Sequence, residues 1–268
     1  MKRRKAMKLA AGAIAGGGAG IFTLSSAFKP EYRSGEKPKK LESENKETSW
    51  KYYRLDSELT ANLAYEQYSK GSCMYAVFIS VVSQLADKFG EPYASFPFHM
   101  MKYGHGGIGG YGTTCGALNG GAAIFGIFVE DKKTRDALIT DLFQWYEQTR
   151  LPEFKPQKAN FDFNPPVSAA ESTLCHASTT KWGKDAGYKI GSDQRKERCR
   201  RLTSDVAAKV SDSLNKFFDN TYITCTHNDE AVNECMTCHG SEGKLGNTSG
   251  KMSCNSCHSE SAGHKVFA

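Results

Sequence analysis

Hydrophobic residues recur at steps of three and four positions along much of the chain, which predicts amphipathic helices. The pattern is clearest over residues 74–89, 138–146 and 206–218. No alternating pattern of any length predicts strands, so we expect a mainly α-helical core over residues 49–220. Four of the eight prolines fall at positions 152–166, where we expect an irregular crossover. Residues suited to the first turn or cap of these helices are Asp56, Asp131 and Ser204 or Asp205.

A glycine-rich run over residues 104–112 leads into Cys115. No strand pattern precedes it and no Lys-Ser/Thr pair follows, so a nucleotide-binding loop is disfavoured. We expect the run to allow close backbone approach to a packed partner or a cofactor. Cys115 should then lie near a helix N-terminus, where the pKa of a thiol is lowered and the thiolate that a metal needs is favoured.

The first 27 residues have the pattern of an export signal. A basic stretch precedes a glycine- and alanine-rich hydrophobic run, and Ser25-Ser26-Ala27 suits signal peptidase. Arg3-Arg4-Lys5-Ala6-Met7-Lys8 is similar to a twin-arginine signal, a route that exports folded proteins. The alternative is an uncleaved anchor, which would tether the protein to the membrane. Cleavage would leave no stable membrane span, and the polar residues 28–48 would then form a linker.

The formal net charge of +6 is concentrated in that signal. Five basic residues and no acidic ones lie within residues 1–27, so residues 28–268 carry only +1. A nearly neutral chain has no electrostatic basis for binding a phosphate backbone, and nucleic acid is excluded as a partner. We expect a periplasmic protein.

Two C-x-x-C-H motifs near the C-terminus carry the most specific chemistry. They are Cys235-Met236-Thr237-Cys238-His239 and Cys254-Asn255-Ser256-Cys257-His258. In each, two thiols can bond to the vinyl groups of one haem, and the adjacent histidine can then ligate its iron. We therefore expect two covalently bound haem c groups per chain in a loop-rich segment over residues 221–268. This segment has few bulky hydrophobic side chains, and two haems would supply the missing hydrophobic mass.

A zinc ribbon is the competing interpretation of the same four cysteines. Cys238 and Cys254 enclose 15 residues, which fits the spacing C-x₂-C-x₁₅-C-x₂-C. A ribbon has no need for histidine after each second cysteine, however, and ribbons are mostly intracellular. Haem is therefore favoured.

The second axial ligands of the haems are not fixed by these motifs. Methionine could serve as well as histidine and would raise the potential. The candidate histidines are His264 first, then His176 and His227, and also His105 in the glycine-rich run and His99.

Five further cysteines, an odd number, argue against a purely disulfide role in an exported protein. Disulfides between some of them are one alternative, and an iron–sulfur centre held by thiolates from different helices is the other. The five are Cys73, Cys115, Cys175, Cys199 and Cys225.

The order of these cysteines resembles a family of redox proteins defined by a C…GCAxxG…C…C pattern. The matching segments are Gly71-Ser72-Cys73, Thr114-Cys115-Gly116-Ala117-Leu118-Asn119-Gly120, Cys175 and Cys199-Arg200-Arg201-Leu202. With the two C-x-x-C-H motifs, residues 54–268 resemble the split-Soret cytochromes c, the dihaem branch of that family. Cys115-Gly116-Ala117 departs from Gly-Cys-Ala.

The resemblance implies a helical homodimer with two haems per subunit, each with two histidine ligands. It also implies an iron–sulfur centre, of the [2Fe–2S] or another type, with Cys73, Cys115, Cys175 and Cys199 as candidate ligands. We expect an electron carrier that serves periplasmic redox partner proteins, since two strong ligands leave no open site on iron for a substrate. The alternative is an enzyme, a reductase acting on a small oxidised substrate.

Overall fold

The structure is a computed structural model that describes residues 50–224, 230–256 and 258. The expected signal and linker lie outside the described residues. So do four residues singled out above, namely Cys225, His227, Cys257 and His264. Within the described part of the chain, no helix combines the length and the hydrophobicity that crossing a membrane requires.

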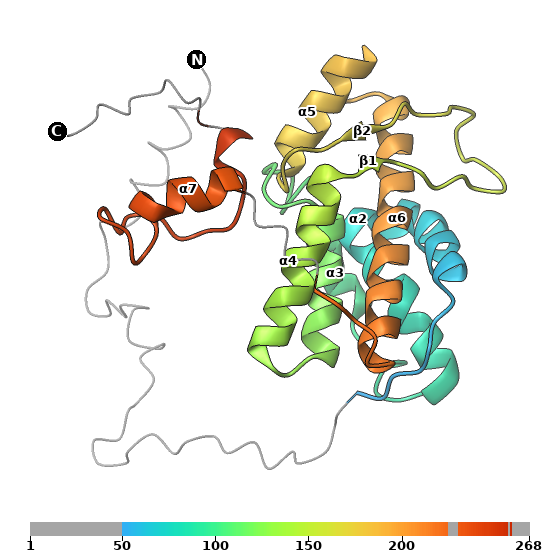
Figure 1. The fold of residues 1–268 in the computed structure, drawn as a ribbon. Coiled ribbons are helices and arrows are strands. Elements are labelled where there is room, and N and C mark those ends of the chain that lie inside the picture. Colours follow the sequence, from blue (N-terminus) through green and yellow to red (C-terminus); the bar gives the residue numbers. More distant parts are fainter. Residues whose placement is uncertain (1–49, 225–229, 257, 259–268) are drawn as a thin grey trace, which may run out of the picture. The chain divides into compact units, whose positions relative to one another are not determined.

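The expected mainly α-helical fold is confirmed (Figure 1). The long helix α2 (Ser57–Phe89) packs mainly against α6 (Asp193–Phe218) and α3 (Gly116–Phe128). Helix α4 (Lys132–Gln148) contacts α3 and α6, and the shorter α5 (Cys175–Ala186) precedes α6 in the chain. The buried faces of α2, α3, α4 and α6 supply most of one hydrophobic core, which gives the site below a rigid frame.

The starts of two helices are as predicted, and the start of a third is not. The carboxylate of Asp56 accepts backbone N–H groups at the start of α2, and Asp131 does the same for α4. The prediction that Ser204 or Asp205 opens a helix is wrong, because both lie inside α6. Ser192 caps that helix instead, through a hydrogen bond from the Arg195 N–H.

Helix α2 is kinked where it reaches the first candidate ligand. Ser72 has φ 65° and ψ −162°, a conformation that residues other than glycine rarely adopt. Immediately beyond it, the N–H of Met74 donates to the carbonyl of Gly104, 3.3 Å away, just after the 3₁₀ helix η1 (Phe98–Tyr103). The kink therefore directs the chain at Cys73 toward the glycine-rich run.

The proline-rich crossover is irregular, as expected. It connects two short strands that the sequence did not predict. Strand β1 (Arg150–Leu151) pairs antiparallel with β2 (Ser168–Ala169). The crossover is fastened to the helices, because Asp205 on α6 accepts the N–H groups of Glu153 and Phe154 at 3.0 and 2.8 Å.

The C-terminal segment is rich in loops, but its first haem motif is helical. Helix α7 (Glu230–His239) ends with that motif, and the 3₁₀ helix η2 (Cys254–Ser256) contains the start of the second. The loop after α7 folds back onto the end of the helix. The N–H of Leu245 donates to the carbonyl of Cys238 at 2.8 Å, and the N–H of Thr248 donates to that of His239 at 2.9 Å.

Candidate functional site

Four cysteines from four helices come together in the helical core. Cys73 follows the kink in α2, Cys115 is the N-cap of α3, Cys175 is the first residue of α5 and Cys199 lies in the second turn of α6. Each of the other three thiols acts electrostatically on Cys73, so the four are mutual neighbours.

The backbone holds two of these cysteines side by side. The N–H of Cys115 donates to the carbonyl of Thr173, and the N–H of Cys175 donates to that of Thr113, both at 2.8 Å. A bridge between Thr114 and Leu174 lies between these bonds. The first turns of α3 and α5 are therefore joined although they are some 60 positions apart in the chain.

Gly116 allows α3 to approach α2 closely at the site. A Cβ atom at this position would lie 1.9 Å from the carbonyl oxygen of Gly104 and 3.1 Å from the Cβ of Cys73. No side chain fits there without moving backbone. The glycine after Cys115 is thus what allows Cys73 and Cys115 to be neighbours.

Three of the four thiols are removed from solvent. Cys73, Cys115 and Cys199 are buried, and Cys175 is partly exposed. Burial raises the pKa of Cys73 well above its ordinary value, and burial raises the pKa of Cys175 to about 12. The seven cysteines that the structure describes are all free thiols, so none of them forms a disulfide.

The predicted position of Cys115 is confirmed, but the predicted lowering of its pKa is wrong. Burial raises the pKa of this thiol, and it outweighs the lowering by the amide groups of Ala117 and Leu118 at the start of α3. Among the described residues, no three His, Cys, Asp or Glu side chains already form a site for a single metal ion.

A buried arginine, unforeseen from the sequence, borders the four cysteines. Arg198 is 1% exposed; its Nη2 donates to Ser178 Oγ at 3.0 Å, and its Nη1 lies 4.0 Å from the sulfur of Cys199. The Nε atom has no hydrogen-bond partner. The Tyr146 hydroxyl also donates to Ser178 Oγ, at 2.9 Å. Every residue of the run Arg195-Lys196-Glu197-Arg198 is charged, which is typical of an exposed helix face, so nothing in the sequence indicates this burial.

The first haem motif presents both its thiols on α7. Cys235 is partly exposed and Cys238 is exposed, one helical turn apart. At the end of the helix, Nδ1 of His239 lies 2.9 Å from Oδ1 of Asn247, within hydrogen-bond distance. A histidine that ligates metal through Nε2 commonly donates its Nδ1–H to such an oxygen, which fixes the ring orientation. This geometry suits His239 as an axial ligand.

The second motif is described in part. Cys254 lies on η2, and the N–H of His258 donates to its carbonyl at 2.9 Å. His258 is exposed, whereas Cys257 and His264 are outside the described residues. Three further candidates, His99, His105 and His176, are exposed, and His176 lies in the first turn of α5, next to Cys175.

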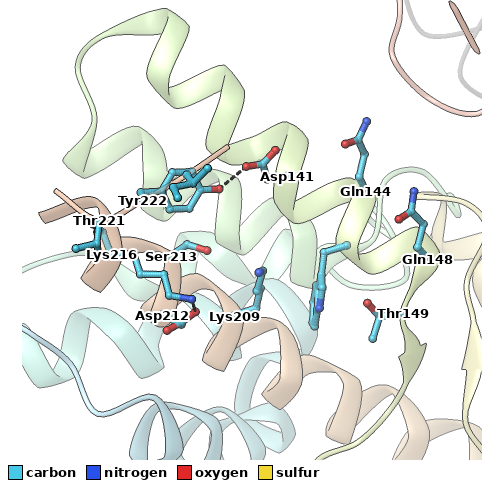
Figure 2. Close-up of a pocket in the computed structure, with 12 residues that line it drawn as sticks. Asp141, Gln144, Gln148, Thr149, Lys209, Asp212, Ser213, Lys216, Thr221 and Tyr222 are labelled. Carbon is cyan, nitrogen blue, oxygen red and sulfur yellow. Dashed lines mark hydrogen bonds and ion pairs between the residues drawn. The ribbon is translucent and has the colours of Figure 1, made fainter. Parts of the chain in front are cut away.

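A pocket of about 360 Å³ lies between α4 and α6 (Figure 2). The Tyr222 hydroxyl donates to Asp141 Oδ2 at 2.6 Å at its edge, and Lys209 lies over the ring of Trp145. Within the described chain, none of the candidate ligands lines it. Its contacts fasten the segment that leaves α6 toward the haem motifs.

Comparison with known proteins agrees with this arrangement. Residues 75–213 match a family model described as "Putative redox-active protein (C_GCAxxG_C_C)". This match spans three of the four clustered cysteines.

One curated relative and one solved structure match over a longer range. The chain is 39% identical over 220 residues to the split-Soret cytochrome c of Desulfovibrio desulfuricans (strain ATCC 27774 / DSM 6949 / MB), covering 80% of this chain and 78% of the relative. A structure reported as "A novel iron centre in the split-Soret cytochrome c from Desulfovibrio desulfuricans ATCC 27774" superposes with a TM-score of 0.76 and 37% identity. It covers 80% of this chain and 91% of that one.

Proposed function

Because this chain belongs to the split-Soret cytochrome c family, we propose that it is a c-type cytochrome that transfers electrons through two haems and an iron centre. The observation that carries the proposal is the presence of two C-x-x-C-H motifs and a converged four-cysteine site in one chain.

In each haem motif the two cysteines and the histidine have different roles in binding haem. Cys235 and Cys238 would hold one haem through two thioether bonds, each formed by addition of a thiol S–H across a vinyl group with no by-product. Cys254 and Cys257 would hold a second haem in the same way. His239 and His258 would ligate the irons. Bound haem supplies one-electron chemistry, and the protein supplies ligation, burial and orientation.

The four-cysteine site fits an iron centre by its donors and by its charge. Thiolate sulfur is the ligand that iron–sulfur groups require. Cys73, Cys115, Cys175 and Cys199 supply it from four helices. The buried guanidinium of Arg198, with an unpartnered Nε–H, favours a negatively charged group beside it. We propose an iron–sulfur centre, of the [2Fe–2S] or another type, at this site.

We further propose export to the periplasm and a homodimer that exchanges electrons with redox partner proteins there. The twin-arginine-like N-terminus supports this location, because that route carries folded proteins and iron–sulfur centres are built in the cytoplasm. Thioether attachment of haem would follow export.

The test is an absorbance spectrum of the full chain, produced in a host with c-type haem maturation, before and after dithionite reduction. We expect sharp low-spin bands that resist acid–acetone extraction, two haems per chain and additional non-haem iron. A colourless protein that contains zinc would overturn the assignment. Carbon monoxide should leave the reduced spectrum unchanged; a shift would instead favour the alternative, a reductase with an open iron.

Matched variants separate the two kinds of centre. Cys238→Ala and Cys257→Ala should each lose or weaken one haem and keep non-haem iron. Cys115→Ala should lose non-haem iron and keep both haems. Unchanged iron in Cys115→Ala, measured by metal analysis against haem absorbance, would contradict the iron centre.

A further inference from the structure

Arg198 is a buried cation without a matching anion. Its side chain is 1% exposed, and its one hydrogen bond to oxygen goes to the neutral hydroxyl of Ser178. In the part of the chain that the structure describes, no carboxylate forms an ion pair with it. An unpaired buried charge destabilises a fold as strongly as breaking a buried ion pair does.

The neighbouring arginines of α6 differ from Arg198, because each of them has a carboxylate partner. Arg200 and Arg201 both pair with Glu197, at 3.1 and 2.8 Å. Glu197 is fully buried, so the fold does supply a buried carboxylate where one is needed. Arg198, which contacts Cys199, has no such carboxylate among the described residues.

The guanidinium is instead held against the four-cysteine site. Ser178 Oγ accepts from both Arg198 Nη2 and the hydroxyl of Tyr146, which is itself buried. These two hydrogen bonds to Ser178 Oγ fix the Nη2 end of the guanidinium. Nη1 lies 4.0 Å from the sulfur of Cys199, and the unpartnered Nε–H is buried as well.

We propose that Arg198 is a positioning residue that sets the reduction potential of the iron centre by balancing its negative charge. The inference rests on the proposed iron centre. Thiolate ligands make such a centre anionic, and reduction adds one electron and hence one further negative charge. Arg198 stays protonated, so no proton moves. A fixed positive charge and N–H groups directed at sulfur stabilise the reduced form more than the oxidised form, which raises the potential.

The experiment is a redox titration of the iron centre, followed by electron paramagnetic resonance, in the full haem-loaded chain. Arg198→Gln removes the charge but keeps N–H donors, and Arg198→Lys keeps the charge. Arg54→Gln is the matched control, because Arg54 is exposed and pairs with Asp219 away from the cysteines. Non-haem iron per haem is measured for each protein.

In Arg198→Gln we expect the ratio of reduced to oxidised iron centre at a fixed potential to fall at least tenfold. For a one-electron couple this corresponds to a reduction potential that is lower by at least 59 mV. Arg198→Lys should recover most of this loss, and Arg54→Gln should show none. The haem potentials should stay unchanged. If Arg198→Gln holds no iron, retention of iron by Arg198→Lys supports the charge role, whereas loss from both shows a packing role and overturns it.

An iron centre present in Arg198→Gln with an unshifted potential would overturn the inference and leave the proposed function intact. Absence of non-haem iron from the unaltered chain would overturn both. The two failures are therefore distinguishable.

Discussion

The imidazole of His239 and the amide of Asn247 lie within hydrogen-bond distance, with 2.9 Å between Nδ1 and Oδ1. The loop between them is also bonded to the end of α7, since the N–H groups of Asn247 and Thr248 both donate to the carbonyl of His239. The side chain that orients the histidine is therefore fixed by the same helix end that carries it.

This pair predicts control of one haem by Asn247. A hydrogen bond from Nδ1 strengthens the histidine as a ligand and favours ferric iron. Asn247→Ala should raise the potential of one haem, and Asn247→Asp should lower it, each by roughly tenfold in the reduced-to-oxidised ratio, ~59 mV. Potentiometric titration of the haem absorbance measures this. Asn255→Ala, an exposed position in the second motif, is the control. Equal shifts in all three variants would contradict the assignment.

Two glycines of α3 provide a second, matched prediction. Gly116→Ala places a Cβ against the Gly104 carbonyl, so backbone must move and stability should fall by about 1–3 kcal/mol. Non-haem iron should fall with it, because Cys73 and Cys115 separate. Gly126→Ala meets nothing within 4 Å and should stabilise the helix by about 0.5–1 kcal/mol with iron unchanged. Thermal unfolding and iron analysis are the measurements, and full iron occupancy in Gly116→Ala would refute this account.

Glu197 is predicted to be a major determinant of stability. It accepts a hydrogen bond from Tyr65 at 2.7 Å and pairs with Arg200 and Arg201. Glu197→Gln leaves the buried Arg201 and the partly buried Arg200 without their anion and should cost about 3–5 kcal/mol in the free energy of unfolding. Asp136→Asn removes an exposed carboxylate and should change stability little. Urea unfolding of both variants tests this; comparable losses would show that burial of Glu197 is not the cause.

The link between α6 and the proline-rich crossover should depend on pH. Burial raises the pKa of Asp205 from 3.8 to about 7, although the N–H groups of Glu153 and Phe154 act to lower it. Between about pH 4 and pH 7 the folded protein thus holds a proton that the unfolded chain has released. The contribution of Asp205 to the free energy of unfolding is therefore complete below pH 4 and is lost as the pH rises to 7. At 1.4 kcal/mol per pKa unit, this loss is at most about 4 kcal/mol.

Asp205→Asn should remove the loss of stability that deprotonation of Asp205 causes between pH 4 and pH 7. Melting temperatures of both proteins at intervals from pH 4 to pH 8 provide the comparison. The melting temperature of the variant should fall less over that pH range than the melting temperature of the unaltered chain. An identical decline would assign the effect to other groups.

The helical core was predictable because hydrophobic periodicity and two acidic caps marked its elements. The error at Ser204 and Asp205 has a physical origin. The first half of α6 contains buried charged residues, Glu197, Arg198 and Arg201, in place of hydrophobic ones. A periodicity based on hydrophobic positions therefore detects only the second half of the helix.

The candidate site was predictable from its cysteines but not from its surroundings. The motifs and their order pointed to the candidate sulfur donors and to the candidate haem histidines. The contacts of Arg198 with Ser178 and Cys199 join α6 to α5, and the contact of Asn247 with His239 depends on the fold of a loop. Such pairings arise from tertiary structure, and no spacing along the chain indicates them.

Among the four clustered cysteines Cys175 alone is partly exposed, and it is the first residue of α5. Cys73, Cys115 and Cys199 are buried, so in the proposed iron centre Cys175 would be the ligand that solvent and oxidants reach first. Metal would enter and leave the proposed centre past the first turn of α5, and a redox partner would come closest to it there. We therefore expect this one turn to govern both the transfer of electrons to the proposed centre and its loss of iron.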